Sequence, residues 1–305
     1  MFHKKNQQTV VWLFLLVTSV CIAVADVDST PYLRLGTGAR SVGMAGAFTA
    51  IADGASATVL NPAGLTGVRD LTFTLATQQL SFDRTHSFIG VAKNINSQST
   101  VGFSLTSFGV DGIPEISSSG EDLGNSFSYG SGAYTLSYGH ALEQVSLGAS
   151  ARIISDKFGL DSDSRSTGLG GLDLGLVGKL YSNTFSYGLA FRNLGGETTP
   201  SLDLGAAFRY GGKNAVTIAL DLSNEFSALE EQATSVKIGV EYVLANMFAV
   251  RAGSQRTSDR TSLYGGFGVS VSDFGINYAI KLVDNTDYDV VGDKNTHYIS
   301  LSYGN

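Results

Sequence analysis

The stretch Leu172-Asp173-Leu174-Gly175-Leu176-Val177-Gly178-Lys179-Leu180 decides the fold class of this chain. Leucine occupies positions 172, 174 and 176, and the positions between and after them hold Asp173, Gly175, Val177 and Lys179. Side chains of a β-strand alternate between its two faces. The stretch therefore predicts a strand with one apolar face and one face of mainly small or charged residues.

The same alternation recurs about fourteen times along the rest of the chain, in segments near ten residues long. The segments are separated by glycine, serine, asparagine and aspartate, which favour turns. We predict strands at 70–79, 85–93, 98–109, 128–140, 144–155, 167–180, 183–193, 201–210, 215–224, 234–244, 246–255, 261–271, 273–283 and 295–304.

Charged residues inside the later predicted strands fall on the face opposite the bulky apolar residues. Asp221, for example, alternates with Leu220 and Leu222. Gly, Ala, Ser and Thr dominate this polar face, whereas strands that face water usually carry more Lys and Glu. We expect the polar face to line a lumen, and its charges are Arg152, Asp173, Lys179, Arg192, Asp203, Arg209, Asp221, Lys237, Glu241, Arg251 and Lys281.

Loop lengths distinguish a membrane barrel from a soluble sandwich. Counted from the first strand, even-to-odd connections are short, whereas most odd-to-even connections are long, as at 110–127, 156–166, 225–233 and 284–294. Short turns on one rim, long loops on the other and an even strand count are typical of outer-membrane barrels. We predict an all-β fold, a 14-stranded antiparallel transmembrane β-barrel in the bacterial outer membrane.

The composition agrees with a surface that does not face water everywhere. The 305 residues are 43% hydrophobic and only 15% charged, and the formal net charge is −7. A chain with net negative charge is not attracted electrostatically to the phosphate backbone of a nucleic acid, so no nucleic-acid partner is expected. With 37 glycines but only 4 prolines, the chain does not fit a collagen-like or disordered composition.

Residues 1–25 are predicted to be a signal peptide. Lys4 and Lys5 precede an apolar run from Val10 to Val20, and Ala23-Val24-Ala25 is an A-x-A cleavage site. The alternative, a membrane anchor, is too short to span a bilayer. The rest of the chain divides into an N-terminal hatch at 26–69 and the barrel at 70–305.

The hatch segment does not alternate and is rich in small residues, which allow close packing of the backbone. We expect it to form a compact plug inside the barrel. Gly36-Thr37-Gly38 is a poor dinucleotide-binding loop, because Ser41 stands where that motif needs glycine. The residues expected to matter in the hatch are Arg34, Gly36, Gly38, Arg40, Gly43, Gly46, Asp53, Asn61, Pro62, Ala63 and Gly64.

From Tyr32 to Leu65 the chain reads Leu-Arg-Leu-Gly-x-Gly-Ala-Arg, then Gly-Met-Ala-Gly-Ala-Phe-Thr-Ala, and finally Asn-Pro-Ala-Gly-Leu. This stretch resembles the start of mature PorV/PorQ-family proteins. The Asn-Pro-Ala element resembles FadL-type hydrophobic-compound channels, which look like relatives of that family. The resemblance implies a 14-stranded outer-membrane barrel with an N-terminal hatch, and for some members a part in type IX protein secretion.

Residues with the spacing of a catalytic or metal site are not evident. His86, His140 and His297 lack ligand spacing, and no G-x-S-x-G is present. The aspartates at 284, 287, 289 and 293 do not fit a calcium-binding loop, because Val291 and Tyr298 stand at ligand positions. We predict a protein that is not an enzyme and has no cofactor or metal.

The charges in the lumen have two interpretations. They either brace the wall and the hatch by ion pairs, with Arg34, Arg40 and Asp53 as partners, or they select an anionic amphiphile. We favour bracing.

Two functions fit the sequence. The first is a component or partner of protein secretion or general export, with secretion-machinery proteins or exported cargo as partners besides membrane lipid. The alternative is a FadL-like transporter of hydrophobic or amphipathic small molecules. A ligand pocket for it would use Phe48, Ile51, Val59 and Leu60, which equally fit ordinary packing of the hatch.

Overall fold

The computed structural model describes residues 30–304 except 81–82, 160–163, 182–183, 227–232 and 283–294. The predicted signal peptide, the first residues of the predicted hatch and the acidic loop at 284–294 therefore lie outside the described residues. Among the described helices, none has the length and apolarity that crossing a membrane requires.

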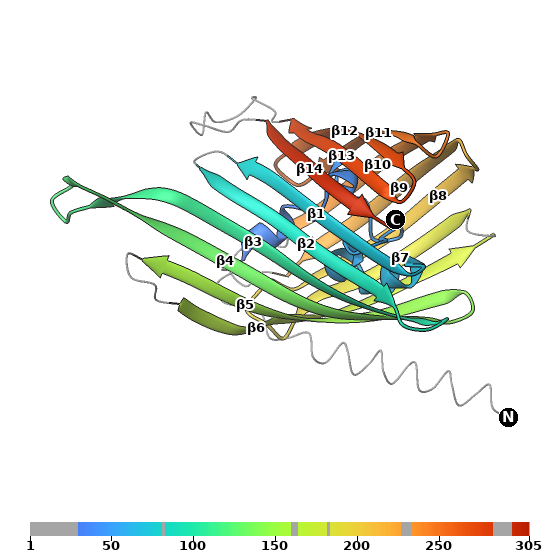
Figure 1. Ribbon diagram of the computed structural model, residues 1–305, viewed down its shortest axis with the longest axis horizontal. Helices are drawn as coiled ribbons and strands as arrows, with labels where there is room; N and C mark the ends of the chain where they lie inside the picture. The colour runs from blue at the N-terminus through green and yellow to red at the C-terminus, as the bar shows by residue number, and fades with distance from the viewer. Residues whose placement is uncertain are drawn as a thin grey trace.

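Fourteen antiparallel strands form one closed barrel in which each strand pairs with its sequence neighbours and β1 pairs with β14 (Figure 1). This confirms the predicted fold class. The strands are β1 Leu71–Leu80, β2 Arg84–Asn94, β3 Ser99–Ile116, β4 Asp122–Ala141, β5 Val145–Gly159, β6 Ser164–Leu180, β7 Phe185–Leu194, β8 Ser201–Gly211, β9 Ala215–Glu225, β10 Ala233–Leu244, β11 Phe248–Arg256, β12 Thr261–Val271, β13 Phe274–Leu282 and β14 Thr296–Tyr303.

The two faces of the wall differ as the alternation predicts. In β9 the outward side chains Ile218 and Leu220 are 47% and 49% exposed, whereas the inward Thr217 and Asp221 are buried. Large hydrophobic side chains are exposed in this way on every strand except β7, whose outward side chains are half-buried. A soluble protein rarely exposes so much contiguous apolar surface, so this face suits lipid.

The two rims differ in their connections. One rim, here called the short-turn rim, consists of the turns 95–98, 142–144, 181–184, 212–214, 245–247 and 272–273. We call the opposite rim the long-loop rim. One prediction for it is wrong, because most of the segment 110–127, expected to be a loop, belongs to strands. Strands β3 and β4 have 18 and 20 residues and form a hairpin that projects beyond the neighbouring strands, with its tip at 117–121 (Figure 1). The predicted loop at 156–166 is likewise mostly strand.

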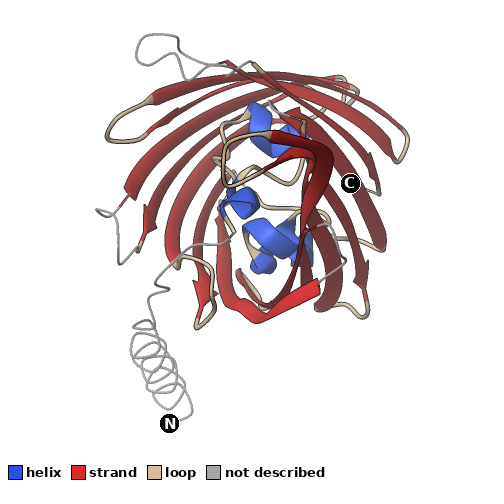
Figure 2. Cartoon of the chain, turned by 90° about the vertical axis from the view of Figure 1, so that its left-hand side faces the viewer, coloured by secondary structure: helices blue, strands red, loops and turns tan. Residues whose placement is uncertain are grey.

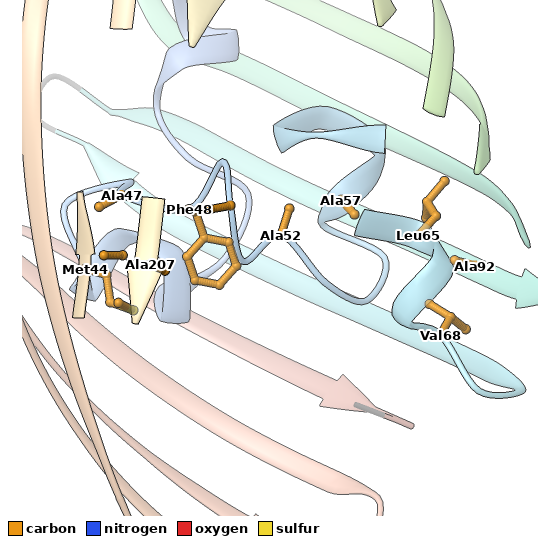
Figure 3. Close-up of a cluster of buried hydrophobic side chains, with 11 residues drawn as sticks. Met44, Ala47, Phe48, Ala52, Ala57, Leu65, Val68, Ala92 and Ala207 are labelled. Atoms are coloured by element: carbon orange, nitrogen blue, oxygen red, sulfur yellow. The ribbon is translucent and has the colours of Figure 1, made fainter. Parts of the chain in front are cut away.

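Residues 30–69 lie inside the barrel as short helical turns joined by irregular segments (Figure 2). The turns are η1 Pro31–Arg34, α2 Ala39–Gly43, α3 Ala57–Leu60 and η2 Pro62–Gly67. We call residues 30–69 the hatch. Met44, Phe48 and Leu65 form its apolar core together with Ala92 and Ala207 of the wall (Figure 3). The core of this molecule is thus shared between the hatch and the inner face of the barrel.

Candidate functional site in the barrel lumen

The hatch touches the wall through a ring of wall glycines, which we call the glycine belt. A β-carbon at any of these positions would lie within 3.0 Å of a hatch atom. The backbone of the hatch therefore packs directly against the backbone of the wall, which any larger residue would prevent. The belt consists of Gly90, Gly102, Gly139, Gly148, Gly175, Gly188, Gly205, Gly239 and Gly253.

Wall side chains bind the backbone of the hatch within this ring. One carboxylate oxygen of Asp221 accepts hydrogen bonds from the backbone N–H groups of Phe48 and Thr49, both at 2.8 Å. The hydroxyls of Ser137 and Ser150 donate to the carbonyl oxygen of Thr58 at 3.3 and 3.1 Å. The wall thus supplies hydrogen-bond partners for backbone groups of the hatch.

Asn61 forms the corner between α3 and η2. Proline at 62 disfavours helical backbone before it, and Asn61 is extended, with φ −161° and ψ 106°. Its side-chain amide donates to the carbonyl oxygens of Thr49 at 2.9 Å and of Leu176 in the wall at 3.2 Å. Its oxygen accepts from the N–H of Ala63 at 3.2 Å. Asn61 is fully buried and joins two parts of the hatch to the wall.

An ion-pair network joins α2 to β10 and β11. The guanidinium of Arg40 donates to both carboxylate oxygens of Glu241 at 2.9 and 3.0 Å and also pairs with Asp53. Arg251 donates to Glu241 at 2.7 Å and to Asn277 at 2.9 Å. Burial opposes the charge of Arg40, but the carboxylates of Asp53 and Glu241 raise its pKa well above the usual value.

A second network lies in the wall at β5, β6 and β7. Arg152 and Asp173, 2% and 1% exposed, form an ion pair at 2.7 Å. Both bind Asn193, whose backbone has a φ of 62°, and Asn193 donates to the carbonyl oxygen of Thr199 at 2.9 Å. The next pair along the wall is Arg192 with Asp203 at 2.6 Å.

The remaining predicted lumen charges also lie on the inward face. Lys237 donates to Ser223 at 2.8 Å, and Lys281 lies over the ring of Tyr264 at 5.9 Å. Lys179 and Arg209 line a cavity of about 300 Å³ at the short-turn end of the lumen. Arg34 of the hatch pairs with Glu225 at 3.3 Å. The predicted charges are therefore distributed around the wall rather than gathered in one cluster.

The predicted hatch glycines serve different local needs. Gly36 and Gly46 have φ values of 98° and 73°, which favour glycine. A β-carbon at Gly64 would clash with the backbone of Ala52, and one at Gly43 would lie 3.3 Å from Arg251. Gly38 lies near Ser300, whose hydroxyl accepts from the N–H of Ala39 at 3.1 Å.

Sequence reasoning missed an aromatic and aliphatic cluster in the lumen on the long-loop side of the hatch. Tyr32 stacks on Phe108 with ring centroids 5.8 Å apart. The rings of Phe108 and Tyr129 meet edge to face, with centroids 6.4 Å apart. Burial raises the pKa of Tyr32 to about 12, so its hydroxyl stays neutral. We call this group the upper aromatic cluster; its members are Tyr32, Leu33, Leu35, Phe108, Tyr129, Ala133 and Ile154.

The four apolar residues proposed from sequence for a pocket lie elsewhere. Phe48 and Val59 are buried, and Phe48 and Leu60 pack with the hatch core. Ile51 lines the cavity of about 300 Å³. A neighbouring cavity of about 260 Å³ is lined mostly by polar groups, among them Arg40, Asp53 and Arg209. Within the described part of the chain, no three His, Cys, Asp or Glu side chains are placed to hold a metal ion.

Comparisons with known proteins place the fold. No family model and no curated protein matched the chain. Among solved structures, the Pseudomonas putida toluene transporter TodX aligns at 15% identity and a TM-score of 0.62, over 92% of this chain and 98% of that one. The Ralstonia pickettii toluene transporter TbuX aligns at 13% identity and a TM-score of 0.64, over 88% of this chain and 98% of that one. A Pseudomonas aeruginosa FadL homologue aligns at 10% identity and a TM-score of 0.63, over 88% of this chain and 98% of that one. At these identities the chain shares the FadL-like fold with channel proteins.

Proposed function

We propose that this chain is a channel of the bacterial outer membrane for small hydrophobic compounds. The observation that carries the proposal is the upper aromatic cluster, where Tyr32 of the hatch stacks on Phe108 of the wall on the long-loop side of the lumen. An apolar site of this kind holds a flat or aliphatic molecule out of water. This revises the preference drawn from the sequence, because it favours the transporter over the secretion component.

The outer surface and the closure of the barrel support a location in the outer membrane. The outward face is apolar on every strand, and a closed barrel leaves no strand edge without a partner. The short-turn rim would then face the periplasm, and the long-loop rim the cell exterior. Two of the aligned solved structures are described as toluene transporters, which agrees with an apolar cargo.

In this proposal, a compound does not pass between the hatch and the wall at the level of the glycine belt. The glycine belt, Asp221 and Asn61 bind the hatch to the wall on many sides. The wall itself is irregular beside the upper aromatic cluster: the pairing of β5 with β6 shifts near Ile154, and β7 pairs with β6 only from Leu172 to Leu180. We infer that a compound leaves the cluster where this pairing is interrupted, because fewer hydrogen bonds must be broken there.

The hatch residues and lumen charges act as braces in this proposal. Among the described residues, five ion pairs join strands to each other or to the hatch, as Arg40 joins Glu241. Removal of one partner from a buried ion pair leaves the other charge buried without compensation and destabilises the fold. Such pairs therefore suit a structural role. Selection of an anionic amphiphile by these charges is the less favoured interpretation.

Reconstitution in lipid vesicles tests the function. We expect the purified barrel to speed the entry of toluene into vesicles relative to empty vesicles, and Phe108→Ser to reduce that entry. Phe103→Ser is the matched control, because Phe103 is on the same strand but faces outward at 46% exposure. Equal entry with and without the protein contradicts the proposal.

A second candidate is the secretion role implied by the resemblance of residues 32–65 to PorV/PorQ-family proteins. The observation that favours it is the projecting β3–β4 hairpin, on which Ile116 and Leu123 are 53% and 51% exposed. Such a hairpin can contact a secretion-machinery protein or exported cargo. Deletion of the gene separates the two candidates: loss of surface proteins with unchanged hydrocarbon uptake supports secretion, and the reverse supports the channel.

A further inference from the structure

A row of inward side chains crosses the wall on the long-loop side of the hatch. Strand register places Tyr298 of β14 opposite Gln78 of β1, Gln78 opposite His86 of β2, and His86 opposite Phe108 of β3. Neighbours at directly opposite positions have β-carbons about 4.5–5.5 Å apart. Gln78 and His86 therefore lie side by side, between the ring of Tyr298 and the upper aromatic cluster.

Gln78 and His86 are buried polar residues, 2% and 3% exposed. Among the described residues, no hydrogen-bond partner reaches either polar atom of the Gln78 amide or Nε2 of His86. The same holds for the hydroxyl of Thr106, on the neighbouring strand β3. A buried polar group without a partner costs free energy, so adjacent groups of this kind mark a place where another molecule belongs.

The neighbours of this polar pair are flat and apolar. Phe108, opposite His86, stacks on Tyr32. The ring of Phe88, the next inward residue on β2, reaches toward Gly90, because a β-carbon at Gly90 would lie 2.7 Å from its Cζ. The Phe88 ring thus leans away from His86 and leaves the polar pair facing the cluster.

The charges nearby do not favour an anion. Arg84, the next inward residue on β2, already has an interaction of its own. At the far end of the row, Asp156 accepts a hydrogen bond from Ser131 and adds negative charge. A carboxylate beside Gln78 would therefore have no free cation in the part of this row that the structure describes.

We propose that Gln78 and His86 form a binding site for the hydroxyl group of a small neutral aromatic compound, whose ring lies against Phe108 and Tyr32. A hydroxyl both donates and accepts. It can donate to Oε1 of Gln78 and accept from the Gln78 amide, or from His86 in the tautomer that carries its hydrogen on Nε2. The site rests on the proposed channel function and refines its cargo from hydrocarbons to phenol-like compounds.

Calorimetric titration of the barrel in nanodiscs tests the site with three probes of similar shape: p-cresol, p-xylene and p-toluate. We expect p-cresol to bind at least tenfold more tightly than p-xylene, because one net hydrogen bond corresponds to about that factor. Gln78→Leu should remove this preference while leaving p-xylene binding unchanged. Gln79→Leu is the matched control, because Gln79 is the next residue on β1 and faces outward.

Several results would overturn the site. They are equal binding of p-cresol and p-xylene by the unaltered protein, a preference that survives in Gln78→Leu, and tightest binding of p-toluate. His86→Phe makes the same test from β2 if Gln78→Leu does not fold, as judged by the mobility of unboiled samples in SDS. Entry of p-xylene into vesicles is measured in parallel. Failure of that entry counts against the channel, whereas entry without a p-cresol preference counts against the site alone.

Discussion

The contact surface between the hatch and the wall, here called the seam, differs from the row of inward side chains around Gln78 and His86. The difference lies in whether buried polar groups have hydrogen-bond or ion-pair partners. In the seam, Glu241 binds two arginines, one oxygen of Asp221 binds two N–H groups and Asn61 binds carbonyl oxygens of both hatch and wall. The other oxygen of Asp221 has no partner among the described residues, but the first oxygen already fixes that side chain. In the row, Gln78 and His86 are as deeply buried, and the described residues offer no partner to the Gln78 amide or to Nε2 of His86. Side chains that already have partners hold the structure together, whereas side chains without them are available to a ligand. The comparison assigns fixation to the seam and binding to the row.

Removing a charge from the seam should have the largest effect. In Glu241→Gln, the buried Arg251 loses its carboxylate and Arg40 keeps only Asp53. We expect a loss of about 3–5 kcal/mol in the free energy of unfolding, measured by urea titration in lipid vesicles. Glu143→Gln on an exposed turn is the control, and a loss no larger than the control's would show that charge does not fix the hatch.

Filling the glycine belt should have the next largest effect. In Gly175→Val, the added side chain meets Asn61 and Ala63 of the hatch. Overpacking of this kind costs about 1–3 kcal/mol. Hydrogen exchange should be faster in hatch amides than in wall amides of the variant. Gly130→Val is the control, because a β-carbon at Gly130 would have no neighbouring atom within 4 Å. It should have little effect on the free energy of unfolding or on hydrogen exchange of the hatch. Similar exchange in both variants would contradict the close packing.

Asn61→Ala should loosen the corner of the hatch. Its loss leaves the buried carbonyl of Thr49 and the N–H of Ala63 without their side-chain partner. We expect about 2 kcal/mol of destabilisation and a higher ion conductance in planar bilayers. Asn125→Ala on the exposed hairpin is the control. Unchanged conductance would mean that the Asn-Pro-Ala element marks the fold without sealing the lumen.

Thr106→Val should have the smallest effect, and in the opposite direction. The hydroxyl of Thr106 is buried and has no partner in the described part of the chain, and valine has nearly the same shape. We expect a change within about 1 kcal/mol, neutral or stabilising, in the same urea titration. A clear destabilisation would show that the hydroxyl has a partner, such as a bound water, and would weaken the contrast between row and seam.

The sequence predicts the barrel closely because one physical rule governs most of it. Lipid on one side and a packed lumen on the other impose a strict period of two, and the fourteen predicted strands match the observed ones to within a few residues at most ends. The rule fails at 110–127, where both faces of the β3–β4 hairpin are exposed and no alternation is needed. Asp111, Gly112 and Pro114, which lie in β3, and Gly124 and Asn125, which lie in β4, are residue types that favour turns, and they therefore read as a loop.

The candidate site was less predictable. Period two places Gln78, His86 and Phe108 on the inward face, but it does not say which inward groups the hatch leaves without a partner. Tyr32 lies far from Phe108 in the sequence and meets it only because the barrel closes around the hatch. The glycines of the belt can be read from the sequence. Their role appears only in the structure, where the hatch lies too close to the wall for a larger residue at these positions.

The pairing of β1 with β14 has a consequence for how the chain folds. Phe73 lies opposite Tyr303, so the ring is completed by a contact between distant ends of the barrel sequence. Contacts of such long range form slowly, and until this one forms two strand edges stand open. The hydroxyl of Ser300 in β14 also binds Ala39 of the hatch, so the same event joins the hatch to the last strand. A substitution that delays this closure would leave those edges exposed for longer. We expect the variant protein to aggregate rather than to form a leaky barrel.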